Sequence, residues 1–80
     1  MERNEIEERF KAIVLDILNV EESELKENAR FKEDLYGDSL DQLEITIYVE
    51  KEFGISLSDD ETIAVVTYGD ALDLIMKKLN

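Results

Sequence analysis

Apolar residues recur every three or four positions along most of this 80-residue chain, and no segment shows the sustained apolar–polar alternation of a half-buried strand. Such spacing gathers the apolar side chains of each segment on one face of a helix. Together with the capping residues described next, it predicts helices at about residues 5–18, 39–53, 59–65 and 68–79. We therefore expect an all-α fold, a small four-helix bundle of three longer helices and one short helix, forming a single domain over residues 1–80.

Capping residues predict where these helices begin and end. Asn4, with Glu7 three residues later, predicts the start of the first helix. Either Asp38 or Ser39 is suited to cap the second helix, because both side chains carry an oxygen that accepts from a backbone N–H group. Gly54 follows that helix at the position where a left-handed residue is common. The same kind of start signal precedes the last two helices, at Ser58 with Glu61 and at Thr67 with Asp70.

Missing residue types exclude several classes of chemistry. The chain has no cysteine and no histidine, which excludes disulfides, thiolate or imidazole metal sites, and histidine-dependent triads. Its glycines stand alone, so there is no loop that cradles phosphate. Residues 34–44 lack the third-position ligand and the sixth-position glycine of a calcium-binding EF-hand loop. We expect a protein that is not an enzyme, holds no metal and is itself acted upon.

The charge balance predicts the kind of partner. The chain carries 21 acidic and 9 basic residues, a net charge of −12, which argues against nucleic-acid binding and favours positively charged partners. The longest apolar run, residues 64–66, is too short to span a bilayer. Residues 1–10 are acidic and lack the apolar core of a signal peptide. These features predict a cytoplasmic monomer without membrane insertion.

Acidic residues concentrate around the second helix, where residues 33–61 hold ten acids and a single base, Lys51. At about 100° per residue, Leu40, Leu43 and Ile47 form one stripe of this helix. A second, roughly opposite stripe contains Ile45, Thr46, Val49 and Phe53. A small bundle has room to bury only one face of a helix, so we expect the Leu40 stripe to be exposed as an acid-rimmed interaction site. The alternatives are a merely solvated acidic face, or packing on both faces.

The start of the second helix carries the most specific local motif. Gly37 permits a tight turn, and Ser39 then stands at the positive end of a helix, where a phosphate ester is favoured. The motif comprises residues 38–41 (DSLD), and it continues through residues 43–45 (LEI) and 50–53 (EKEF). Residues 31–35 (FKEDL) and 58–61 (SDDE) fit on either side. With these motifs the chain resembles the acyl carrier protein family from Ile6 to about Leu79.

The resemblance implies a function for Ser39. This residue would be the attachment point of a 4′-phosphopantetheine arm, transferred from coenzyme A by a magnesium-dependent phosphopantetheinyl transferase, with Asp38 helping to position it. The arm's thiol would hold acyl intermediates as thioesters for delivery to fatty acid biosynthesis enzymes. Basic docking grooves on these enzymes would bind a surface formed by Leu40, Asp41, Leu43, Glu44, Ile47 and Glu50. The acyl chain would shelter in a pocket lined by Leu43, Thr46, Val49, Leu57, Val65 and Ala71.

The residues leave the cargo and the pathway open. Gln42 and Thr46 make the pocket side of the second helix more polar than a long fatty chain prefers, which favours a shorter or more polar cargo. If Thr46 instead bonds back to a carbonyl of its own helix, the pocket is ordinary. A carrier of the same fold for polyketide, nonribosomal-peptide or D-alanine transfer is one alternative function. An acidic helical adaptor that is never modified is another.

Overall fold

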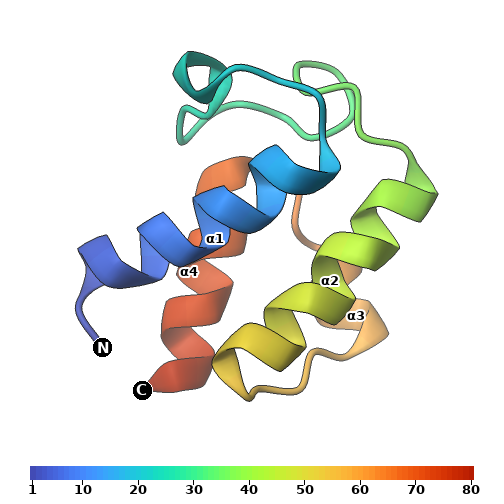
Figure 1. Cartoon of the computed structure of the whole chain (residues 1–80). Coiled ribbons are helices and arrows are strands. Elements are labelled where there is room, and N and C mark those ends of the chain that lie inside the picture. The colour runs from blue at the N-terminus through green and yellow to red at the C-terminus, as the bar shows by residue number, and fades with distance from the viewer.

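The computed structural model describes residues 1–80, and the chain forms four α-helices (Figure 1). Their bounds are α1 Arg3–Ile17, α2 Ser39–Phe53, α3 Asp59–Ile63 and α4 Tyr68–Leu79. A single turn of 3-10 helix, η1 Glu22–Glu24, lies in the long loop between α1 and α2. The only strand-like pairing is an isolated bridge between Arg30 and Thr67. The predicted all-α architecture of three longer helices and one short helix is confirmed.

Most of the predicted helix ends are confirmed by their backbone geometry. Side-chain oxygens of Asp38, Ser58 and Thr67 each accept from the N–H group three residues later, and each helix start forms a reciprocal capping box. Gly54 ends α2 with a φ of 65°, in the left-handed region that glycine adopts without a steric penalty. Ile55 then donates its N–H group to the carbonyl of Glu50 at 3.2 Å.

Two predicted boundaries are wrong. Asn4 does not cap α1, because the carbonyl of Glu2 already accepts from the N–H group of Ile6 and the helix begins at Arg3. The short α3 ends at Ile63 rather than near residue 65. Its chain leaves the helix because the carbonyl of Val66 accepts from the N–H group of Phe31 at 3.0 Å, a partner in the distant loop.

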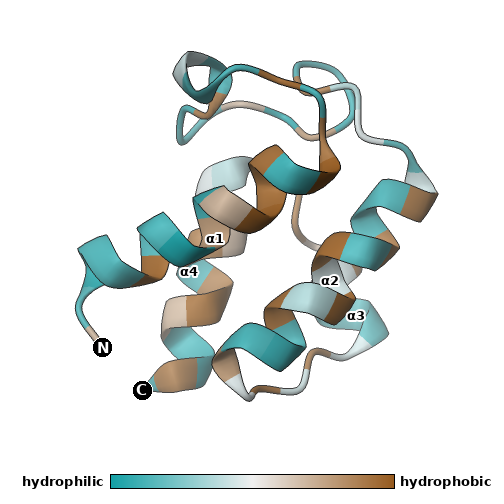
Figure 2. Cartoon of the chain, in the orientation of Figure 1, coloured by the Kyte–Doolittle hydropathy of each residue, from teal (hydrophilic) through white to brown (hydrophobic).

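One apolar core joins the helices to the long loop. Residues of α1, α2 and α4 supply most of it, and α1 packs against both of the other two. The loop between α1 and α2 contributes Leu25, Ala29, Phe31 and Leu35, all at most 9% exposed, so it is the packed loop that its apolar residues predict. No charged side chain is buried. In Figure 2, brown hydrophobic positions recur along α2 between teal hydrophilic ones.

The same loop is held to the junction of α3 and α4 by its backbone. The N–H group of Tyr68 donates to the carbonyl of Ala29, and that of Gly69 donates to the carbonyl of Glu27, both at 2.9 Å. The ring of Tyr68 packs on Phe10 of α1, with their centroids 5.3 Å apart. These contacts position the end of the loop, and therefore the start of α2, against the rest of the molecule.

Candidate functional site

The start of α2 presents Ser39 to solvent. Asp38, not Ser39, is the capping residue: its Oδ1 accepts from the N–H group of Asp41 at 2.9 Å, and Oδ2 of Asp41 accepts from the N–H group of Asp38 at 3.3 Å. Ser39 is therefore the first residue of the helix, and it is exposed. Its hydroxyl is not used to hold the helix end and remains available for chemistry.

The turn before Ser39 is pressed against the body of the protein. The N–H group of Gly37 donates to the carbonyl of Phe31 at 2.8 Å, and Leu35 is 1% exposed. A Cβ atom on Gly37 would lie 3.4 Å from both the Leu18 side chain and the Phe31 carbonyl oxygen, at the short end of van der Waals contact. Glycine at this position therefore lets the chain lie close to the core while the next residues project outward.

Tyr36 is a feature of this turn that sequence reasoning missed. It is the only non-glycine residue with a positive φ, 57°, although the sequence assigns the tight turn to Gly37. The left-handed conformation costs a residue with a Cβ atom about 1–2 kcal/mol. The Tyr36 side chain is 81% exposed. Apart from the neighbouring glycine, no sequence signal marks Tyr36 as the strained residue.

The electrostatics of this helix start suit a phosphate ester. Unpaired N–H groups and the helix dipole give the amino end of a helix a partial positive charge, which stabilises an attached phosphate. The chain contains no histidine or cysteine, so no imidazole or thiolate is available to activate the Ser39 hydroxyl. Nowhere do three or more acidic side chains gather closely enough to hold a metal ion. Ser39 thus lies exposed at the positive end of α2.

The outer face of α2 is uncovered, as the sequence predicts. Leu40, Leu43 and Ile47 are 63%, 56% and 42% exposed, whereas Ile45 and Val49 of the opposite stripe are at most 8% exposed. The flanking residues on the outer side include the carboxylates of Asp41 and Glu44, of which Glu44 is exposed and makes no ion pair within the chain. The helix therefore presents an apolar stripe with an acidic margin.

Glu50 is placed differently from the other residues of this predicted surface. It is half-buried, and its Oε2 accepts from the N–H group of Leu57 at 2.8 Å. Its carboxylate thus holds the loop between α2 and α3. The sequence predicts that Glu50 lies on the surface that partner enzymes contact. The helical pattern does not indicate its hydrogen bond to Leu57, because that residue lies seven positions later, beyond the helix.

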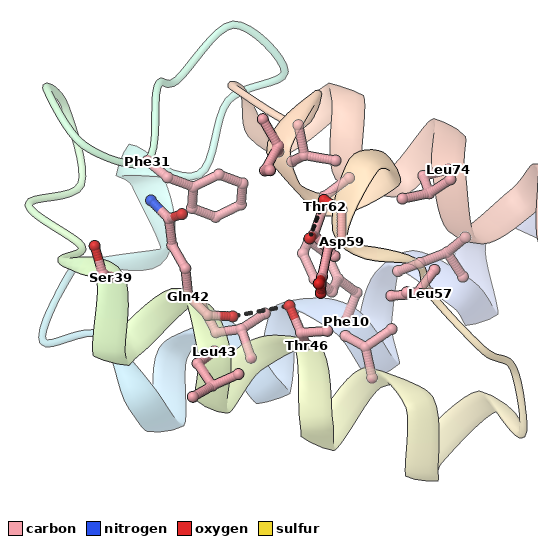
Figure 3. A pocket seen from close by; sticks show the side chains of 16 residues that line it. Phe10, Phe31, Ser39, Gln42, Leu43, Thr46, Leu57, Asp59, Thr62 and Leu74 are labelled. Atoms are coloured by element: carbon pink, nitrogen blue, oxygen red, sulfur yellow. Dashed lines mark hydrogen bonds between the residues drawn. The ribbon is translucent and has the colours of Figure 1, made fainter.

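A cavity of about 270 Å³ opens beside Ser39 between α2, α3 and α4 (Figure 3). It is lined by 16 residues, 11 of them hydrophobic, and the set includes Phe10 of α1 and Phe31 of the long loop. The structure brings to this cavity all six residues that the sequence proposed for an acyl pocket: Leu43, Thr46, Val49, Leu57, Val65 and Ala71. Sequence reasoning missed several other lining residues: Ile45, Asp59, Thr62, Ile63, Leu74 and Ile75.

Two hydroxyl groups on the cavity wall are satisfied by their own helices. Thr46 donates its hydroxyl to the carbonyl of Gln42, and Thr62 donates to the carbonyl of Asp59, each at 2.9 Å (Figure 3). The alternative in which Thr46 bonds back to its helix is therefore the one observed. Neither hydroxyl needs a partner from within the cavity, so these threonines make the wall less polar than their identity suggests.

Comparison with known proteins defines the class. A family model described as a phosphopantetheine attachment site matches residues 8–75, which contain the whole of α2 and the cavity wall. The chain thus belongs to the class of small helical carriers that hold phosphopantetheine.

The particular family follows from individual relatives. Acyl carrier proteins from two strains of Porphyromonas gingivalis are each 45% identical over 76 residues, covering 95% of this chain and 97% of the relative. A solved acyl carrier protein from Enterococcus faecalis superposes with a TM-score of 0.83 at 28% identity, covering 98% of this chain and 99% of the other. The chain belongs to the acyl carrier protein family: it is a carrier rather than an enzyme, and its cofactor is 4′-phosphopantetheine.

The residues at the start of α2 fit this group. An exposed hydroxyl outside the capping hydrogen bonds, the positive end of a long helix and an apolar cavity that begins at the same serine are all present. None of the helices has both the length and the apolar character needed to cross a bilayer.

Proposed function

We propose that this protein holds acyl intermediates on a 4′-phosphopantetheine arm attached to the hydroxyl of Ser39 and delivers them to enzymes of fatty acid biosynthesis. The observation that carries the proposal is the exposed Ser39 at the first position of α2, freed by the Asp38 cap and bordering an apolar cavity. When bound, the arm supplies a thiol that holds the acyl group as a thioester. The proposal includes a single carrier domain over residues 1–80, a cytoplasmic location and a monomeric state.

Attachment requires the Ser39 oxygen to attack the phosphorus of coenzyme A that bears the pantetheine. A bond forms between Oγ and this phosphorus, the bond to the second phosphate breaks with its electron pair, and adenosine bisphosphate leaves. The hydroxyl proton passes to a base of the magnesium-dependent transferase. Within this chain, Asp38 fixes the backbone that carries Ser39, and the amino end of α2 stabilises the negative charge of the new phosphodiester.

The outer face of α2 is the docking surface for partner enzymes in this proposal. Its apolar stripe offers a small contact area, and its carboxylates steer basic grooves toward Ser39 without requiring tight binding. A carrier that visits several enzymes needs fast encounter and fast release, which such a surface provides. The residues proposed for it are Leu40, Asp41, Leu43, Glu44 and Ile47, with the half-buried Glu50 at its edge beside the loop between α2 and α3.

The cavity is the proposed shelter for the acyl chain. Its wall is mostly apolar, and its two threonine hydroxyls are satisfied internally, so an aliphatic chain leaves neither hydroxyl unpaired. Leu43, Val49 and Leu57 lie on this wall. Gln42 and Asp59 also border it, and they favour the second candidate function, a carrier of the same fold for polyketide, nonribosomal-peptide or D-alanine transfer.

The attachment is tested by intact mass after incubation with coenzyme A, magnesium and a broad-specificity phosphopantetheinyl transferase. The unmodified protein gains one phosphopantetheine group, and Ser39→Ala gains none while keeping its helical circular dichroism. Ser56→Ala, which changes another exposed serine, is the matched control and is modified normally. A protein that never gains mass would instead be an unmodified adaptor.

The cargo is tested on the modified protein. A malonyl transferase and a set of amino-acid-activating enzymes are offered in parallel, and the loaded product is read by mass. We expect loading with malonyl groups. Loading with an amino acid and not with malonate would refute the role in fatty acid biosynthesis and support the second candidate.

A further inference from the structure

Tyr36 adopts an unfavourable backbone conformation, and no core contact of its side chain offsets the cost. Its backbone is held at a φ of 57° because both neighbours are anchored: Leu35 lies in the core, and Gly37 donates to the carbonyl of Phe31. Glycine or asparagine adopts this conformation at lower cost. A bulky aromatic residue is therefore the less stable choice for the fold at position 36.

The ring of Tyr36 takes no part in the core packing of the chain. It belongs neither to the core nor to the half-buried side chains packed against it, and its hydroxyl makes no hydrogen bond to another residue. At 81%, it is the most exposed of the large apolar side chains on the surface. Strain that persists without an internal contact indicates a role outside the folded chain.

The position of Tyr36 indicates where that role lies. It stands three residues before Ser39, and the exposed Leu40 follows Ser39 directly. The green segment that leads into α2 runs along the edge of the molecule (Figure 1). Four carboxylates, Glu33, Asp34, Asp38 and Asp41, lie within residues 30–41 against two bases, Arg30 and Lys32. The excess of acids beside an exposed aromatic face favours a cationic contact.

We propose that Tyr36 is a recognition residue for the phosphopantetheinyl transferase, with its ring receiving an arginine or lysine side chain of that enzyme. This inference depends on the proposed attachment at Ser39. The transferase must bring the anionic diphosphate of coenzyme A to the Ser39 hydroxyl itself, so its cationic groups must come close to this turn. Enzymes that act later reach the cargo at the far end of a flexible arm and need not approach Tyr36.

The test measures the kinetics of modification together with thermal stability on the full-length unmodified protein. Tyr36→Asn and Tyr36→Gly remove the ring and suit the left-handed backbone. We expect both to raise the KM for the carrier about fivefold to tenfold, with kcat nearly unchanged and a melting temperature equal to or above that of the natural protein. Tyr36→Phe keeps the ring face and therefore the natural KM.

A matched control separates this contact from a general loss of surface area. Tyr48 is another exposed tyrosine, 51% exposed on α2, and Tyr48→Ala should leave the KM unchanged. A natural KM in Tyr36→Asn and Tyr36→Gly overturns the inference and leaves the attachment at Ser39 intact. A raised KM accompanied by a lower melting temperature also overturns it, because the residue would then act through folding. If the natural protein is not modified at all, the proposed function fails, and this inference fails with it.

Discussion

The two faces of α2 carry apolar residues of similar kinds but meet different surroundings. Ile45 on the inner face is 8% exposed, whereas Ile47, two positions later in the same helix, is 42% exposed. The inner face packs on α1 and the core, while no element of the chain covers the outer face. Hydrophobicity alone therefore does not decide burial in a small bundle, because a helix face is buried only where another helix or loop packs on it. An apolar face without a neighbour remains available to other proteins.

The largest expected effect separates the two faces by stability. Ile45→Ala should lower the free energy of unfolding by about 2–4 kcal/mol, because it removes buried methyl groups and leaves a cavity. Ile47→Ala should lower it by no more than about 0.5 kcal/mol, the usual range for an exposed position. Urea denaturation of both variants measures the difference. Similar losses in the two variants would show that the outer face is covered in solution.

The second effect tests charge on the outer face. Glu44→Lys should reduce productive docking with a basic partner roughly tenfold at low salt, because it replaces an attraction by a repulsion. The deficit should shrink as salt rises, since exposed charges are screened. The rate of phosphopantetheine transfer at two salt concentrations measures it. Asp16→Lys on α1 makes the same change in net charge away from Ser39 and should have little effect; an equal loss there would assign the effect to net charge alone.

A smaller effect concerns Glu50, which lies between the two faces. Glu50→Ala removes the acceptor for the N–H group of Leu57 and should lower the free energy of unfolding by about 1 kcal/mol. Glu50→Gln keeps an acceptor oxygen, so it should lower the free energy of unfolding by only a few tenths of the loss in the alanine variant. Amide hydrogen exchange at Leu57 should be faster in the alanine variant alone. Faster exchange in both variants would show that the charge, and not the hydrogen bond, holds the loop.

The smallest effect is a pH dependence at α3, which closes the cavity beside the inner face. The ammonium group of Lys78 lies 2.8 Å from the carboxylate of Glu61 and, with the N–H group of Ser58, lowers the pKa of Glu61 from 4.5 to about 2. A lowered pKa stabilises the folded state above pH 4.5, and this stabilisation is lost as pH falls toward 2. Lys78→Met should therefore be less stable than the natural protein near neutral pH. Thermal melting from pH 7 to 2 should show the two curves converging at the acidic end, and a constant difference would contradict the pairing.

Local sequence signals predicted the helices well because their causes lie within a few residues. The apolar spacing and the capping residues together located all four helices, and the caps at Asp38, Ser58 and Thr67 are the ones observed. The failure at Asn4 has a local reason too, since nothing before it stops the helix from extending to Arg3. The early end of α3 has a distant cause, the hydrogen bond between Phe31 and Val66, which no local pattern reveals.

The candidate site also has features that the sequence predicts and features that only the structure shows. The serine at the start of α2 and the acidic block around it are visible in the linear order of residues. Which of two suitable residues caps the helix became clear only from the geometry, which assigns the cap to Asp38 and leaves Ser39 exposed. The strained Tyr36 and the contact between Glu50 and Leu57 had no sequence signal.

By itself, the sequence determined the helical period, the family motif at residues 38–41 and the excess of negative charge, because each of these is a property of neighbouring residues. Only the tertiary structure decided that Glu50 holds the loop at Leu57, which further residues line the cavity and which residue bears the backbone strain. These features arise where segments far apart in the chain meet, so they depend on packing between elements and not on the composition of any one of them.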